Sequence, residues 1–174
     1  LPGNGLGYGQ RRLMGQPAML WHPANGRDVV KKSPAMNVHP GLKAVIETVL
    51  VASPMAKSLG LELTDLAVDQ IGMRMPFRPQ DVTVAEMVHG GAIAGLIDTA
   101  GAVASASGID PDGGLKGGAT SAMTIHYLSP ANGVDLAAKA IVIKRSISQT
   151  ISEISVRGPD GQLVAKGVVT SRLF

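Results

Sequence analysis

A single carboxylate, Asp98, lies near the middle of a long run of apolar and small residues. It is the only charged residue between His89 and Ile109. Burying an unpaired carboxylate is costly, so such a group normally has a partner or a function. A carboxylate can act as a general base toward water or as a nucleophile toward a carbonyl carbon. We therefore interpret Asp98 as a candidate catalytic residue, with a structural hydrogen-bonding role as the alternative.

The residues around Asp98 have the spacing of one long helix, from His89 to about Ser107. Interior glycines cost roughly 1 kcal/mol each in a helix, so the small residues beside Asp98 indicate a narrow slot on that side. At about 100° per residue, the helix has a bulky side, expected to face the core, and a small side that includes Asp98. The bulky side carries Ile93, Leu96, Ile97, Ala100, Val103 and Ala104. The small side carries Asp98 with Gly91, Ala94, Gly95, Gly101, Ala102 and Ser105.

This helix would begin at the sequence His89-Gly90-Gly91. The free N–H groups and the positive dipole end of a helix N-terminus stabilise negative charge. The Gly90 amide is therefore a candidate donor to a carbonyl oxygen that gains charge during a reaction. We expect His89 to cap the helix, with acid–base chemistry as the alternative. The two glycines could also serve close packing alone.

The composition argues against several other kinds of site. The sequence has no cysteine, which excludes disulfides, thiol catalysis and cysteine metal ligands. His22, His39 and His126 lack metal-ligand spacing, and the Gly-x-Ser-x-Gly elbow of α/β serine hydrolases is missing. Aromatic residues make up 3% of the chain, which disfavours base stacking on single-stranded nucleic acid. We expect no metal or redox cofactor and no nucleic-acid partner.

The positive charge of the chain is concentrated at its N-terminal end. Residues 1–40 carry five basic residues and one acidic residue, and this stretch is rich in Gly, Pro and Asn. We predict that residues 1–38 are a leader, either disordered or partly vector-derived, followed by one domain over 39–174. The leader shows no apolar signal-peptide segment, and Asp98 disfavours a membrane helix over 89–109. We therefore expect a cytoplasmic protein that does not enter a membrane.

Hydrophobic periodicity predicts one helix before the long helix and strands on both sides of it. The first helix is expected over Gly41–Ala52. The turn sequences Asn132-Gly133 and Asp160-Gly161 are hairpin signals. The fold class is therefore α+β, an antiparallel sheet wrapped around one long central helix. The strands are expected near 59–63, 71–77, 119–128, 134–144, 148–157 and 162–171.

Two stretches resemble a known family. The sequence from Val88 to Ile93, with Asp98-Thr99-Ala100 following, resembles hotdog-fold acyl-CoA thioesterases of the PaaI-like, phenylacetate-pathway type. The stretch from Met123 to Ala131 resembles the strand after the helix in that family. The resemblance covers about residues 40–172. It implies a hotdog fold, an acyl-CoA substrate, Asp98 as general base or nucleophile, and the Gly90 amide as the donor that polarises the thioester carbonyl.

The same resemblance suggests further site residues. Thr120 matches the hydroxyl residue that often positions the attacking water, and Gly91 lies beside the carbonyl donor. Thr83 stands where many relatives carry Asn or Gln, a departure that leaves the rate, or even the reaction, in question. Cations are needed for the phosphates of CoA, and the candidates, which could equally be ordinary strand-end charges, are Lys144, Arg145 and Arg157.

One chain is not expected to form a complete site. Gly90 and Asp98 are eight residues apart, or about 12 Å along a helix axis, whereas a reacting carbonyl needs its donor and its attacking group each within about 3–3.5 Å. A second, antiparallel copy would bring the two residues together. The spacing therefore predicts a homodimer, or two such dimers paired, and the resemblance implies that it hydrolyses acyl-CoA to free acid and CoA. A non-catalytic acyl-CoA-binding module and a hotdog hydratase or dehydratase are the alternatives.

Overall fold

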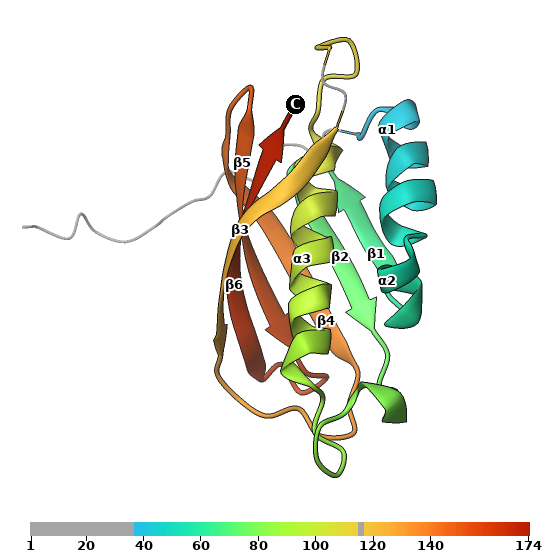
Figure 1. Ribbon diagram of the computed structural model, residues 1–174, viewed down its shortest axis with the longest axis vertical. Helices are drawn as coiled ribbons and strands as arrows, with labels where there is room; N and C mark the ends of the chain where they lie inside the picture. The colour runs from blue at the N-terminus through green and yellow to red at the C-terminus, as the bar shows by residue number, and fades with distance from the viewer. Residues whose placement is uncertain (1–36, 115–116) are drawn as a thin grey trace, which may run out of the picture. The chain divides into compact units, whose positions relative to one another are not determined.

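The computed structural model describes residues 37–114 and 117–174. A six-stranded antiparallel sheet packs against one long helix, as Figure 1 shows. This arrangement confirms the predicted α+β class. The predicted leader lies outside the described residues except for residues 37 and 38. The elements in chain order are α1 (Pro40–Val45), η1 (Ile46–Val51), α2 (Pro54–Ser58), β1 (Glu62–Ala67), β2 (Gln70–Met75), η2 (Pro79–Asp81), α3 (Gly90–Ser107), β3 (Gly118–Tyr127), β4 (Leu136–Arg145), β5 (Gln149–Arg157) and β6 (Leu163–Leu173).

The first predicted helix forms in two parts. His39 caps α1, because its Nδ1 atom accepts a hydrogen bond from the Gly41 N–H at 3.2 Å. From Ile46 the chain continues as the wider π-helical segment η1. The strand expected near residue 59 begins only at Glu62, since Leu59 is the C-terminal cap of α2.

The strand order is β1-β2-β4-β5-β6-β3. The predicted hairpin at Asp160-Gly161 forms between β5 and β6, but the hairpin expected at Asn132-Gly133 does not. That turn is instead hydrogen-bonded to the loop between η2 and α3, because the Gly133 N–H donates to the Glu86 carbonyl at 3.0 Å. β3 pairs with β6 and forms an edge of the sheet.

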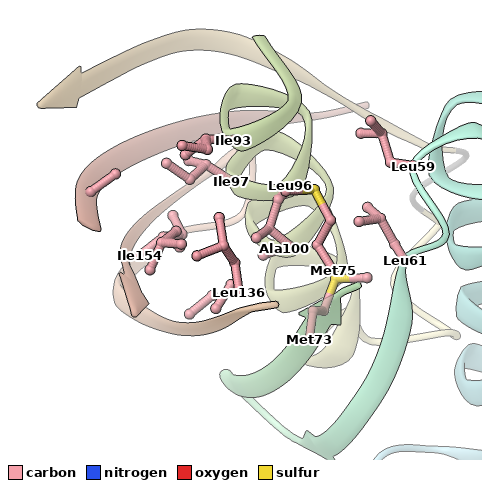
Figure 2. Packing of buried hydrophobic residues seen from close by; sticks show 14 of the residues in the cluster. Leu59, Leu61, Met73, Met75, Ile93, Leu96, Ile97, Ala100, Leu136 and Ile154 are labelled. Carbon is pink, nitrogen blue, oxygen red and sulfur yellow. The ribbon is translucent and has the colours of Figure 1, made fainter. Parts of the chain in front are cut away.

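The predicted inner side of α3 is buried as expected. Leu96, Ile97, Ala100 and Val103 are fully buried. Figure 2 shows the first three of these side chains among buried side chains of the strands. Their packing is apolar throughout, and the strand residues labelled there include Met73, Met75, Leu136 and Ile154.

Two residues assigned to the small side of α3 face the sheet instead. A Cβ atom at Gly101 would lie 2.7 Å from Cβ of Val169, so this glycine permits close approach of the helix to the sheet. Ser105 is buried, and its Oγ accepts a hydrogen bond from Oγ1 of Thr150 at 2.6 Å. Fewer residues than predicted therefore line the slot beside Asp98.

The residues that the structure describes include no helix long and apolar enough to cross a membrane.

Candidate active site

The N-terminus of α3 presents one free amide. His89 has the extended conformation of an N-cap residue, with φ −64° and ψ 134°, and its Nδ1 accepts from the Gly91 N–H at 2.7 Å. This confirms the predicted capping role of His89 and occupies the donor of Gly91. The Gly90 N–H has no acceptor among residues 37–114 and 117–174. The helix therefore presents the Gly90 amide, with the positive end of its dipole, to an incoming oxygen.

Tyr127 of β3 covers this helix start. Its hydroxyl donates to the Gly90 carbonyl at 2.9 Å, which ties the first turn of α3 to the edge strand. A cavity of about 350 Å³ beside Gly90 is lined by Tyr127 and Thr83, among others. Thr83 thus lines the same cavity as the proposed carbonyl donor. The sequence analysis did not assign a role to Tyr127, although it belongs to the stretch that carried the family resemblance.

Asp98 has one side-chain partner within the described residues. The Thr120 hydroxyl donates to Oδ1 of Asp98 at 2.6 Å. Thr120 comes from β3, where the register with β6 shifts between Thr120 and Ala122. Such a bulge redirects a side chain from the regular alternation of a strand. The structure therefore brings together two of the predicted site residues, and the second carboxylate oxygen of Asp98 remains available for a water or a carbonyl carbon.

The small residues beside Asp98 do not all face outward. A Cβ atom at Gly95 would lie 2.7 Å from Cδ1 of Leu59, so the space at Gly95 is filled by the chain's own side chain. Besides Asp98, the residues of this side that are at least partly accessible are Gly91, Ala94, Gly95 and Ala102. Gly95 therefore permits the close approach of Leu59 to α3.

The three predicted phosphate-binding cations do not form one cluster. Arg145 donates to Oδ1 of Asp69 and to the carbonyl oxygens of Ala104 and Ser105, at 2.5 to 3.3 Å. A cation suits this place, because the C-terminal end of a helix dipole is negative. Arg157 donates to the Gly161 carbonyl at 2.7 Å.

Lys144 lies on β4 and is exposed. The neighbour of Arg145 on β5 is Thr150, and seven residues of strand, about 23 Å, separate Thr150 from Arg157. Contact of these cations with CoA stays a prediction. No group of three His, Asp or Glu side chains suited to a metal ion occurs among the residues described.

Comparisons with known proteins agree with this geometry. The model of the thioesterase superfamily matches residues 85–165. A Halobacterium salinarum protein, provisionally named an esterase, is 32% identical over 119 residues, which cover 67% of this chain and 78% of that protein. The chain belongs to the thioesterase superfamily. This superfamily chain also resembles the solved structure of the Escherichia coli PaaI protein from the phenylacetic acid degradation operon, with a TM-score of 0.68 and 25% identity over 76% of this chain and 93% of PaaI.

The fold of this thioesterase-superfamily chain is likewise that of a thioesterase from Haemophilus influenzae. The TM-score is 0.67 at 20% identity, and the match covers 76% of this chain and 90% of the other. The architecture is therefore the hotdog fold, and membership of the superfamily supports thioester hydrolysis. Asp98, Thr120 and Gly90 all lie inside the matched region, which makes them this chain's candidates for the chemistry of the family.

Proposed function

We propose that this protein hydrolyses acyl-CoA thioesters to a free acid and CoA. The observation that carries this proposal is the hydrogen bond from Thr120 to Asp98 on the small-residue side of a helix whose first amide is free. The acidic group is thereby held in one orientation, and the amide has the position of a carbonyl donor. Membership of the thioesterase superfamily supports the reaction class.

The chemistry follows from charge. When a nucleophile adds to a thioester carbon, negative charge develops on the carbonyl oxygen, and the Gly90 N–H stabilises it at the helix N-terminus. Asp98 either removes a proton from the attacking water or attacks the carbon itself. Collapse of the tetrahedral intermediate breaks the carbon–sulfur bond. Coenzyme A leaves as the thiol or thiolate. If water attacked, the acyl group leaves directly as the acid. If Asp98 attacked, the acyl group first stays on Asp98 as a mixed anhydride, which a water molecule then hydrolyses to release the acid and restore the carboxylate.

We further propose that each site is shared by two copies of the chain. Gly90 and Asp98 lie about 12 Å apart along α3. Within one chain, Gly90 and Thr120, the hydrogen-bond partner of Asp98, line different cavities. An antiparallel second copy would place its Asp98 opposite the Gly90 of the first.

The edge strand β3 supports this dimer. Its outer edge has no strand partner among the described residues, and Met123 and Tyr127 on it are 39% and 53% exposed. Unpaired strand edges with exposed apolar side chains are sites of pairing with another chain. Pairing of two such dimers stays a prediction.

The alternative reaction on the same fold receives less support. A hydratase or dehydratase would use a histidine together with an acid, but the Nδ1 atom of His89 accepts from the Gly91 amide. A non-catalytic acyl-CoA-binding module is favoured by one observation: Thr83, in the cavity beside Gly90, has no amide to hold the carbonyl or the water.

The function is tested by measuring free thiol released from a panel of acyl-CoA thioesters. We expect the wild-type protein to release CoA from at least one thioester, and Asp98→Asn to lower turnover by at least about 100-fold, because positioned acid–base groups contribute that much. Asp112→Asn, in an exposed loop, is the matched control and should retain full turnover. Binding without turnover in the wild type would indicate the non-catalytic module, and full activity of Asp98→Asn would remove Asp98 from the mechanism.

A further inference from the structure

The first turn of α3 contains two consecutive glycines. Gly90 and Gly91 follow His89 at the helix start, and glycine has more accessible backbone conformations than any other residue. The Gly90 N–H, which is the proposed carbonyl donor, belongs to the peptide between His89 and Gly90. A donor stabilises a developing charge most when its orientation is fixed before the reaction. The orientation of this donor therefore depends on the contacts that hold the neighbouring peptides in place.

The peptide between Gly90 and Gly91 is held at both of its polar groups. The Gly91 N–H donates to Nδ1 of His89 at 2.7 Å, and the Gly90 carbonyl accepts from the Tyr127 hydroxyl at 2.9 Å. Tyr127 is 37 residues from Gly90 in the sequence. On β3 it lies opposite the buried Ala165 of β6, so its side chain is on the face of the sheet that packs against α3. Tyr127 thus anchors this peptide to the sheet.

The other backbone groups of His89 are also bonded. The His89 N–H donates to the Asp81 carbonyl at 2.8 Å, and the His89 carbonyl accepts from the N–H groups of Ala92 and Ile93 at 2.9 and 3.2 Å. Of the four backbone polar groups of His89 and Gly90, only the Gly90 N–H has no partner within the described parts of the chain. The bond from Tyr127 completes this set, because it occupies the Gly90 carbonyl.

The aromatic ring of Tyr127 makes a contact that can be separated from the hydrogen bond. A Cβ atom at Gly90 would lie 3.4 Å from Cε1 and 3.5 Å from Cζ of Tyr127, so the ring packs close to the Gly90 backbone. Phenylalanine keeps the ring and lacks the hydroxyl. Tyr127 also lines the cavity beside Gly90, and a direct contact with substrate is therefore the competing role that a test must separate.

We propose that Tyr127 is a positioning residue for thioester hydrolysis: by holding the Gly90 carbonyl, its hydroxyl fixes the direction of the Gly90 N–H. The inference rests on the proposed function, because it requires the Gly90 amide to be the donor to the thioester carbonyl oxygen. Negative charge develops on that oxygen only during the reaction. Loss of the hydroxyl should therefore weaken binding of the transition state more than binding of the substrate.

The test compares kcat and KM of full-length wild type and Tyr127→Phe on the acyl-CoA that the wild type hydrolyses best. The variant should lower kcat about three- to tenfold, equivalent to about 0.7–1.4 kcal/mol, which is the range of a neutral hydrogen bond. Its KM should stay within about twofold. A loss in kcat that is matched in kcat/KM indicates an interaction made only in the transition state.

Thr124→Val is the matched control, because it also removes one hydroxyl from β3. Thr124 is exposed and lies opposite Val168, which is 40% exposed, on the outer face of the sheet. Its kcat and KM should equal those of the wild type. Melting temperatures of both variants measure any contribution to stability separately. An equal loss of kcat in Thr124→Val and Tyr127→Phe would show a general effect on the strand and would overturn the positioning role.

A second measurement tests whether Tyr127 acts through the glycine backbone. Gly90 does not have a positive φ, so alanine can adopt its conformation while restricting the alternatives. Tyr127→Phe should therefore lower kcat by less than about twofold when it is introduced into Gly90→Ala. An equal loss in the Gly90 and Gly90→Ala backgrounds would show that the hydroxyl does not act on this backbone, and would overturn the inference.

The failures of the two proposals differ. No CoA release by the wild type from any thioester overturns the proposed function and this inference with it. With an active wild type, an unchanged kcat in Tyr127→Phe overturns the positioning role alone. A raised KM with unchanged kcat also overturns it, because that result would place Tyr127 in direct contact with the substrate.

Discussion

The shared site makes a quantitative prediction about two inactive variants mixed together. One chain carries Asp98→Asn and lacks the carboxylate. The other carries Gly90→Pro and lacks the amide N–H. Proline is well tolerated at the first position of a helix, and His89 already has the extended conformation that a residue before proline requires. A Cβ atom at Gly90 would lie 3.4 Å from Cε1 of Tyr127, an ordinary contact.

The expected recovery follows from counting sites. Random exchange of equal amounts gives about half mixed dimers. In each mixed dimer, one site combines the intact Asp98 of one chain with the intact Gly90 of the other, and the second site lacks both. The mixture should therefore recover about a quarter of wild-type activity. Each variant alone should lose about 100-fold or more, since one oxyanion donor contributes about 2.7–4 kcal/mol.

The assay is thiol release before and after subunit exchange, with the mixed species quantified by native mass spectrometry. Gly90→Ala is the matched control for Gly90→Pro, because it adds the same Cβ atom but keeps the N–H; it should remain active. Melting temperatures check that each variant folds. If mass spectrometry shows mixed dimers and activity stays at the level of the separate variants, the shared site is refuted.

Two other predictions concern single side chains. Thr120→Val should lower kcat about tenfold or more, because a hydrogen bond to a charged group contributes about 1.5–3 kcal/mol. Thr120→Ser keeps the donor, and its kcat should stay within about threefold of the wild-type value. Equal activity of the two variants would show that the hydrogen bond to Asp98 does not contribute to turnover. The Phe77 amide and Arg74 hold the pKa of Asp135 below its ordinary value. The contribution of these contacts to the free energy of unfolding is therefore present above about pH 4, and it is lost as the pH falls through the folded-state pKa. Asp135→Asn should therefore lower the melting temperature at pH 7 and weaken its dependence on pH below about 4, and an unchanged acid limb in thermal melts would contradict this.

The long helix could be predicted from the sequence because its signal is local. The 3.6-residue period separates the bulky residues from the small ones, and the buried side of α3 follows it at Leu96, Ile97 and Ala100. The period does not say what fills the space beside a glycine. Gly95 accommodates Leu59 and Gly101 accommodates Val169, and both partners are distant in the sequence.

Strand pairing was harder to predict, because it too joins residues that are distant in the sequence. Asn132-Gly133 has the residues of a hairpin turn, but its backbone is tied to Glu86 rather than closing a β3–β4 hairpin. The contact between Thr120 and Asp98 was suggested by family resemblance, not by any local pattern. The bond from Tyr127 to Gly90 joins a strand to a helix start and leaves no periodic signal in the sequence.

The position of β3 has a consequence for how the chain folds. β3 carries Thr120, yet among the described strands its hydrogen-bonded neighbour is β6, about 45 residues later. Closing a loop of that size costs entropy before the pairing returns any stability. During synthesis α3 and the strands before β6 can form first, while Asp98 still lacks its Thr120 partner. We expect the candidate active site to be among the last parts of the domain to acquire its native geometry, and an intermediate without β6 to expose β3 on both edges and to be prone to aggregation.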